Sequence, residues 1–170
     1  PFCFSKVRPL SDKAAKHPAP WQPLLVHGRW SGDGWGTAWL QVEDIDADPA
    51  RFWSSLIAAI ARQRPEAGAR LAPLVIGSAG DDRVIVPALV NELLDGERLV
   101  LVIDDYHLIG DATVHRGVER LIDLCPAQLT IVLATRVDPP FRLGRMRVRN
   151  RVSEVRAHDL RFASEEAAAL

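Results

Sequence analysis

Residues 99–107, which read LVLVIDDYH, decide the fold of this chain. Five apolar residues follow one another without polar alternation, which is typical of a strand whose two faces are both covered. Such a strand belongs in the centre of a parallel α/β sheet. The run ends in two carboxylates, Asp104 and Asp105. Because ligands of open α/β sheets bind at the carboxyl ends of the strands, the two aspartates fall where a ligand would bind.

A carboxylate at this position can hold Mg²⁺, directly or through water, while the metal bridges the phosphates of a nucleotide. This arrangement is the Walker B element of nucleotide-binding proteins. An aspartate after a buried strand also has an ordinary structural use, because aspartate starts loops and caps helices. The stretch by itself leaves both interpretations open.

The composition is that of an ordinary globular domain. The chain has 170 residues, of which 48% are apolar and 25% charged, and its net charge of -1 does not mark a dedicated nucleic-acid binder. It contains no apolar run long enough to cross a bilayer and no signal-peptide pattern at its start. Two cysteines, Cys3 and Cys125, exclude a disulfide framework and a zinc-finger spacing, so a cytoplasmic location is the expectation.

The residues before the central strand predict one strand and two helices. Residues 37–42 (TAWLQV) are expected to form a strand. Asp48 and Pro49 then supply an N-cap and a first helical residue. The helix that they start should end near Pro65 and Gly68, and a loop is expected over 65–83.

A second helix is expected over 86–94, with Pro87 in its first turn. Its inner stripe is predicted from the apolar spacing, and comprises Leu89, Val90, Leu93 and Leu94.

A strand–helix–strand unit follows. Asp111 can cap a helix whose apolar stripe includes Val114 and ends at Cys125, which is expected to act as a small buried hydrophobe. His115 lies off that stripe and is expected in solvent. Residues 129–134 (LTIVLA) form a second wholly apolar strand, and a right-handed crossover would make it parallel to the first.

The second strand continues as TRVDPP, so Arg136 should emerge at the same sheet edge as Asp104 and Asp105. A guanidinium there can contact a terminal phosphate and report its presence. It can equally pair with one of the aspartates, and both interpretations remain open.

Residues 27–36 (HGRWSGDGWG) are glycine-rich and follow a short apolar run, PLLV. A phosphate loop is expected in such a place, but the pattern G-x-x-x-x-G-K-[ST] does not occur and no lysine follows the glycines. A flexible segment is the ordinary alternative.

Five arginines crowd residues 142–151, where a loop is expected that either contacts phosphates or is a solvated face. Residues 152–156 (VSEVR) alternate like an edge strand. Ser164 can cap a further helix, which the last residue, Leu170, would cut after one turn. With Pro1 at its start, the sequence is expected to be a fragment.

Four segments in order, DPARFWSSLIAAI, LVLVIDDYHLI, IVLATRVDPP and HDLRFASEEAAAL, resemble the nucleotide-binding domain of the large LuxR-type transcriptional regulators of the MalT kind. Those regulators are STAND signalling ATPases, relatives of the AAA+ branch of P-loop NTPases. The resemblance covers roughly residues 37–170. It implies an α/β fold: a three-layer, parallel-sheet, P-loop NTPase-like domain, incomplete because the P-loop strand and its helix are missing.

The resemblance also implies site residues and cofactors. Asp104 would be the magnesium carboxylate of the Walker B element, Asp105 would orient or activate the attacking water, and Arg136 would sense the terminal phosphate. The cofactors would be ATP and Mg²⁺. His107 matches a family position without an assigned role. The loss of the P-loop strand would leave a gap beside the sensor strand.

The organisation expected is an irregular segment over 1–36, a partial nucleotide-binding domain over 37–163 and the start of a helical region over 164–170. The function expected is a partial or degenerate ATPase module of a MalT-like regulator. Its partners would be nucleotide and other domains of a larger regulator, without direct DNA or membrane binding. The alternatives are a non-catalytic protein-interaction domain and an active ATPase with an atypical phosphate loop.

Overall fold

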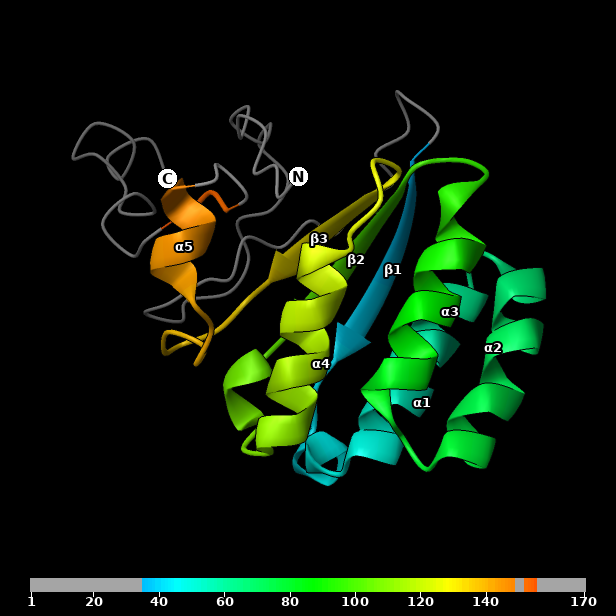
Figure 1. Cartoon of the computed structure of the whole chain (residues 1–170), viewed down its shortest axis with the longest axis horizontal. Coiled ribbons are helices and arrows are strands. Elements are labelled where there is room, and N and C mark those ends of the chain that lie inside the picture. The colour runs from blue at the N-terminus through cyan, green and yellow to red at the C-terminus, as the bar shows by residue number, and fades with distance from the viewer. Residues whose placement is uncertain (1–34, 149–151, 156–170) are drawn as a thin grey trace, which may run out of the picture.

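The computed structural model describes residues 35–148 and 152–155, which contain one parallel β-sheet with helices packed against it (Figure 1). The sheet has three strands in the order β1-β2-β3, and both pairings are parallel. The strands are β1 (Gly36–Gln41), β2 (Leu99–Asp104) and β3 (Leu129–Leu133). The predicted α/β class and the strands predicted at 37–42, in the central run and at 129–134 are confirmed, and the sheet fits an incomplete P-loop NTPase-like fold.

Within the described residues, two 3₁₀ turns and four α-helices connect these strands, and a fifth α-helix follows the last strand. The α-helices are α1 (Pro49–Ala61), α2 (Pro65–Ser78), α3 (Asp82–Leu94), α4 (Ala112–Asp123) and α5 (Leu143–Val148). The turns are η1 (Asp44–Ala47) and η2 (Tyr106–Leu108). None of the helices in the described part of the chain has the length and hydropathy needed to cross a bilayer.

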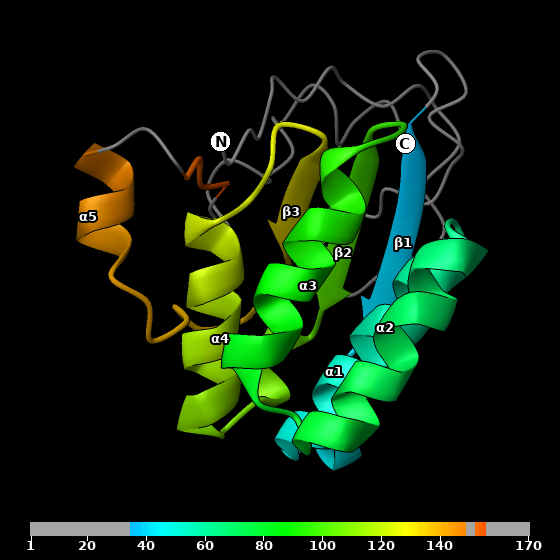
Figure 2. The same ribbon diagram turned by 45° about the vertical axis from the view of Figure 1, so that its right-hand side comes forward.

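The helices that cross from strand to strand lie on one face of the sheet. Strand order matches chain order, so each crossover steps in the same direction, and right-handed crossovers then place their helices on one side. Figure 2 shows α3 and α4 in front of the strands. Helix α1 packs on β1, and α2 packs on α1 and α3.

The core lies between this helical layer and the sheet. Leu99, Leu101 and Ile103 of β2 are each at most 1% exposed and face the helices. A fully buried leucine or isoleucine stabilises the fold by roughly 1.5–3 kcal/mol. Phe52 and Trp53 of α1 are buried in the same core, with their ring centroids 5.2 Å apart in an edge-to-face contact. The central position predicted for β2 is therefore confirmed.

Aspartates cap three of the helices, two of them as the sequence predicts. The Asp48 carboxylate accepts a 3.0 Å hydrogen bond from the Arg51 amide at the start of α1. Asp111 accepts from the amides of Thr113 and Val114 at the start of α4. These bonds satisfy backbone donors that have no partner inside the helix.

The loop predicted over 65–83 is wrong, because most of it is helix α2. Pro65 occupies the first position of α2. An amide hydrogen at this position would have no partner inside the helix, so its absence in proline does not destabilise the helix. Pro73 lies inside the helix on its exposed side, so water can satisfy the carbonyl that its ring leaves unpaired. Gly68, expected to end α1, packs instead against Ala61 at the contact between the two helices.

Helix α3 starts four residues earlier than predicted. Asp81 is its N-cap, accepting from the Arg83 amide at 2.9 Å, so Pro87 lies in the interior rather than in the first turn. The predicted inner stripe is correct at Leu89 and Leu93, which are buried, but wrong at Leu94, which is 46% exposed.

The predictions for the last described residues are partly wrong. The arginine-rich loop expected over 142–151 contains helix α5, in which Met146 is buried while Arg145 and Arg147 are exposed. Residues 152–155 have no strand pairing, so the edge strand expected there is not found in the part that the structure describes. The glycine-rich stretch before Trp35 and the helix expected from Ser164 lie outside the described residues.

Candidate functional site

The carboxyl ends of β2 and β3 meet at one rim of the sheet. Ile103 and Leu133 are paired in the register of the two strands. Beyond them, the Ala134 amide donates to the Ile103 carbonyl at 2.9 Å, and the Tyr106 amide donates to the Ala134 carbonyl at 3.0 Å. These two bonds hold together the segments that carry the predicted site residues.

Asp104 is the last residue of β2 and is 8% exposed. Its Oδ1 atom accepts a 2.8 Å hydrogen bond from the Asp105 amide. Burial raises the pKa of the Asp104 carboxyl, and this effect outweighs the backbone hydrogen bond, which favours the ionised form. The carboxylate is thus held at the rim in an environment where its charge is costly.

Asp105 follows in the left-handed backbone conformation, with φ of 52°. This conformation is uncommon outside glycine, and asparagine and aspartate tolerate it better than most residues. The turn directs the Asp105 side chain towards β1, where the Gln41 Nε2 atom donates a 2.6 Å hydrogen bond to Oδ2. Gln41 is the last residue of β1 and faces Asp104 in the strand register. A residue of the neighbouring strand therefore fixes the second carboxylate.

His107 lies on the other side of the Asp105 carboxylate. Its Nδ1 atom is 3.7 Å from Asp105 Oδ1, which is too long for a hydrogen bond. That nitrogen is buried and has no hydrogen-bond partner among the described residues. Asp105 is thus flanked by an amide donor and by an imidazole in the part of the chain that the structure describes.

Arg136 is the third residue after β3 and is exposed. The preceding residue shapes the loop, because the Thr135 hydroxyl donates to the Val137 carbonyl at 2.8 Å. Since β2 and β3 are parallel, Arg136 leaves the sheet at the rim where Asp104 and Asp105 leave it. The role of all three residues in binding nucleotide stays a prediction.

An aromatic cluster lies behind the rim. The Tyr106 hydroxyl and His115 Nδ1 are 2.8 Å apart, and the Phe141 ring centroid lies 5.6 Å from that of Tyr106 and 6.3 Å from that of His115. Tyr106 is 1% exposed, and burial raises the pKa of its hydroxyl. The prediction that His115 is solvated is therefore wrong. The cluster joins η2, α4 and the segment that follows Arg136.

Cys125 is partly buried, two residues after the end of α4, and its thiol lies 3.2 Å from the Leu129 carbonyl. The predicted role as a small hydrophobic residue agrees with its packing against the core.

The rim residues fit a magnesium–nucleotide ligand only in part. Mg²⁺ prefers oxygen ligands and usually takes one or two carboxylates, with waters and phosphate oxygens completing its shell. The Asp104 Oδ1 atom is occupied by the Asp105 amide, which leaves Oδ2 for a metal-bound water. Among the described residues there is no group of three or more potential metal ligands. Asp104 would thus help to hold a metal ion that is bound mainly by the nucleotide phosphates and by water.

Sequence reasoning missed Gln41 and the contact between Tyr106 and His115. A signal for Gln41 exists, because it is a polar residue at the end of a predicted strand that adjoins the aspartate-bearing strand. No comparable signal joins Tyr106 to His115, since their contact depends on how α4 packs against η2.

The chain resembles known proteins over most of its length. It is 31% identical over 143 residues to the serine/threonine-protein kinase PknK of Mycobacterium tuberculosis, an alignment that covers 82% of this chain and 13% of PknK. It is 30% identical over 154 residues to the HTH-type transcriptional regulator MalT of Vibrio cholerae, covering 89% of this chain and 17% of MalT. For the MalT of Yersinia enterocolitica the identity is 29% over 156 residues. No family model matches the chain.

These relatives place the chain with the P-loop NTPase-like α/β domains of the STAND and AAA+ kind, and the three-strand sheet of the described residues fits an incomplete form of that fold. More particularly, the chain is related to the MalT-like regulators along most of its length, which confirms the resemblance stated from its motifs. It spans only 13% of the length of PknK and 17% of the length of MalT. The activities of those whole proteins therefore come to this chain only as proposals.

Proposed function

We propose that this chain is the ATPase-type signalling module of a MalT-like transcriptional regulator, in a partial form that binds ATP–Mg²⁺ weakly and does not hydrolyse it alone. The observation that supports this function is the rim at which two parallel strands deliver Asp104, Asp105 and Arg136. When bound, Mg²⁺ would neutralise charge on the nucleotide phosphates.

Each residue at this rim would have a different role in binding the nucleotide. Asp104 would hold metal-bound water through its Oδ2 atom, and Arg136 would contact the terminal phosphate. Asp105 would orient a water, but Gln41 occupies one of its oxygens at 2.6 Å. That bond favours a state without nucleotide in which the Asp105 carboxylate is hydrogen-bonded to Gln41.

Weak binding is proposed because the sequence contains no G-x-x-x-x-G-K-[ST] pattern. In P-loop proteins, backbone amides and a lysine surround the phosphates and supply much of the binding energy. The rim alone offers one carboxylate for the metal and one guanidinium for a phosphate. We therefore expect a dissociation constant of about 1 mM, which corresponds to about 4 kcal/mol of binding free energy.

Titration of the protein with ATP–Mg²⁺, followed by thermal unfolding and by NMR, tests the proposal. Saturation should raise the unfolding temperature by linkage, and Asp104→Ala or Arg136→Ala should abolish the effect. Arg145→Ala on α5 is the matched control and should leave it unchanged. Micromolar binding that depends on Asp104 would show a complete nucleotide site. If the protein shows no Asp104-dependent binding at an ATP–Mg²⁺ concentration of about 10 mM, the proposal that it binds nucleotide is wrong.

A further inference from the structure

A groove of about 800 Å³ lies on the side of the domain away from β3. It is lined by the end of β1, by η1, by one side of α1 and by the last turn of α2. Helices α1 and α2 run side by side there (Figures 1 and 2). The proposed nucleotide rim makes no use of this groove, except that Gln41 borders both.

The side of α1 that lines the groove carries small residues between two arginines. Ser54, Ser55 and Ala58 lie between Arg51 and Arg62 on this side of the helix. Small side chains let a second helix approach closely, since interaxial distances depend on the residues at the contact. The arginines are separated by three turns, or about 16 Å along the axis.

The arginines at the two ends of the groove have no internal counter-charge. Neither Arg51 nor Arg62 forms an ion pair with a carboxylate in the part of the chain that the structure describes. Asp46 also lines the groove, but its carboxylate is 5% exposed and accepts from the Ser55 hydroxyl at 2.8 Å and from the Glu43 amide at 3.0 Å. Glu43 also lines the groove and is exposed, but it precedes η1, so the exposed charge that α1 itself presents to the groove is positive.

Large apolar side chains complete the groove. Ile76 of α2 is 83% exposed and Ile45 of η1 is 54% exposed, and both line the groove together with Trp39 of β1. Two isoleucines at one concave surface are costly to leave in water, since each hydrophobic side chain gains roughly 1.5–3 kcal/mol on full burial. Apolar residues of this kind at a concave surface mark an interaction site.

We propose that this groove docks an amphipathic α-helix of another protein domain, with carboxylates about three turns apart facing Arg51 and Arg62. The apolar face of that helix would cover Ile45 and Ile76, in the helix-in-groove mode of recognition. Its closest approach would be over Ser54 and Ala58. Because Gln41 lines the groove and also holds Asp105, the docked helix would contact the residue that fixes the second carboxylate of the rim.

Fluorescence anisotropy with labelled synthetic peptides tests the docking. The first probe is a helical peptide of alanine and leucine, about 16 residues long, with glutamates about three turns apart. The second has lysine in place of each glutamate, and the third has the composition of the first in scrambled order. The glutamate peptide should bind the protein at least about tenfold more tightly than either of the others.

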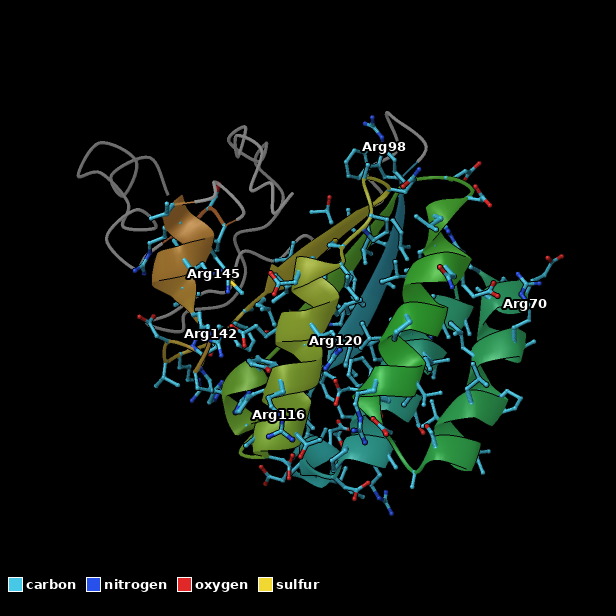
Figure 3. The ribbon with its side chains drawn as sticks, in the orientation of Figure 1. Arg70, Arg98, Arg116, Arg120, Arg142 and Arg145 are labelled. Carbon is cyan, nitrogen blue, oxygen red and sulfur yellow. The ribbon has the colours of Figure 1, made fainter. Side chains whose placement is uncertain are left out.

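Exposed residues of the groove provide variants that should fold normally. Arg51→Glu and Arg62→Glu together should weaken binding of the glutamate peptide about tenfold and should make the lysine peptide the better ligand. Ala58→Trp, which fills the groove, should also weaken it at least about tenfold. The matched controls on α4, Arg116→Glu and Ala112→Trp, should change nothing, because neither residue lines the groove; Figure 3 shows Arg116 on α4. Circular dichroism confirms that each variant is folded.

Three outcomes would overturn the proposal. Equal binding of the glutamate and lysine peptides would show that the arginines do not select the partner. Unchanged binding by Ala58→Trp would place the peptide elsewhere. Dimerisation of the protein without peptide, detected by analytical ultracentrifugation and abolished by Ala58→Trp, would show that a second copy of the chain occupies the groove. None of these outcomes depends on whether the rim binds nucleotide.

Discussion

The Gln41 side chain donates a 2.6 Å hydrogen bond to the Asp105 carboxylate, across two neighbouring strands that end at the same level. The two residues are 64 positions apart in the chain. Asp105 can make this contact because its left-handed backbone turns its side chain towards β1. The position of an acidic group at the rim is therefore set jointly by the parallel register and by one strained residue.

Gln41→Leu should lower the free energy of unfolding by about 1 kcal/mol, because the hydrogen bond to the Asp105 carboxyl group is lost. Asp105→Asn, which keeps the shape of the side chain, should cost less. A double-mutant cycle that combines Gln41→Leu with Asp105→Gly, which removes the acceptor, measures the coupling between the two residues by urea denaturation, expected at about 1 kcal/mol. Additive effects of the two substitutions would contradict the contact.

Asp105→Gly should cost less stability than Asp105→Ala, although both remove the carboxylate. Glycine adopts a φ of 52° without strain, whereas alanine meets the steric penalty of the left-handed region, about 1 kcal/mol. Thermal and urea unfolding of the two variants isolate this backbone effect. Equal stability of the two would show that the turn relaxes when the side chain is removed.

Asp104→Asn should stabilise the domain at neutral pH, by about 2–4 °C in unfolding temperature. Burial raises the pKa of the Asp104 carboxyl, so its stabilising contribution is lost as pH rises through the folded-state pKa. Asparagine can still accept from the Asp105 amide but carries no charge. The difference between the variant and the wild type should shrink as pH falls towards the unfolded pKa of about 4.

His115 should make the free energy of unfolding increase with pH, which is the opposite of the effect expected from Asp104. Burial lowers the pKa of this imidazole, so the unfolded chain binds its proton at a higher pH than the folded chain does. Stability should fall as pH drops below the unfolded pKa of about 6.5, until the folded-state pKa is reached.

His115→Gln should flatten the stability profile between about pH 7 and pH 5. Urea unfolding at several pH values measures this. Tyr106→Phe is the companion variant, because it removes the hydroxyl that lies 2.8 Å from His115 Nδ1 and keeps the ring. An unchanged slope in His115→Gln would assign the pH dependence to other groups.

Gly68→Ala and Gly77→Ala should have opposite effects on stability, although both lie in α2. A Cβ atom at Gly68 would lie 2.3 Å from Ala61 Cβ, so α1 and α2 would have to separate, at a cost of about 1–3 kcal/mol. At Gly77 a Cβ atom meets nothing within 4 Å, and the helix should gain up to about 1 kcal/mol. Destabilisation by both substitutions would contradict the packing of α2 described above.

The strands and the rim were predictable because one physical signal determines each of them. The apolar runs of β2 and β3 are typical of buried parallel strands, and parallel strands bring their carboxyl ends together. The sequence alone therefore predicts that Asp104 and Arg136 lie at one rim. The strand register predicts where these residues lie but does not predict whether they bind nucleotide.

Helix α2 was not predictable from local rules, because four residues in it are usual helix breakers. Pro65 is tolerated at the first position and Pro73 on the exposed side, while Gly68 is needed for contact with Ala61. Each exception depends on a neighbour in space rather than in sequence. The same reason explains why the solvated position predicted for His115 was wrong, since Tyr106 reaches it only in the packed domain.

The agreement of strand order with chain order has a consequence for the way in which the domain folds. Joining β2 to β3 closes a loop about half as long as the loop that joins β1 to β2, so it loses less chain entropy. We therefore expect the β2–α4–β3 unit to assemble first and to act as the template on which β1 and its three helices condense. Unfolding by force or by denaturant should then release β1 before the strand that carries Asp104.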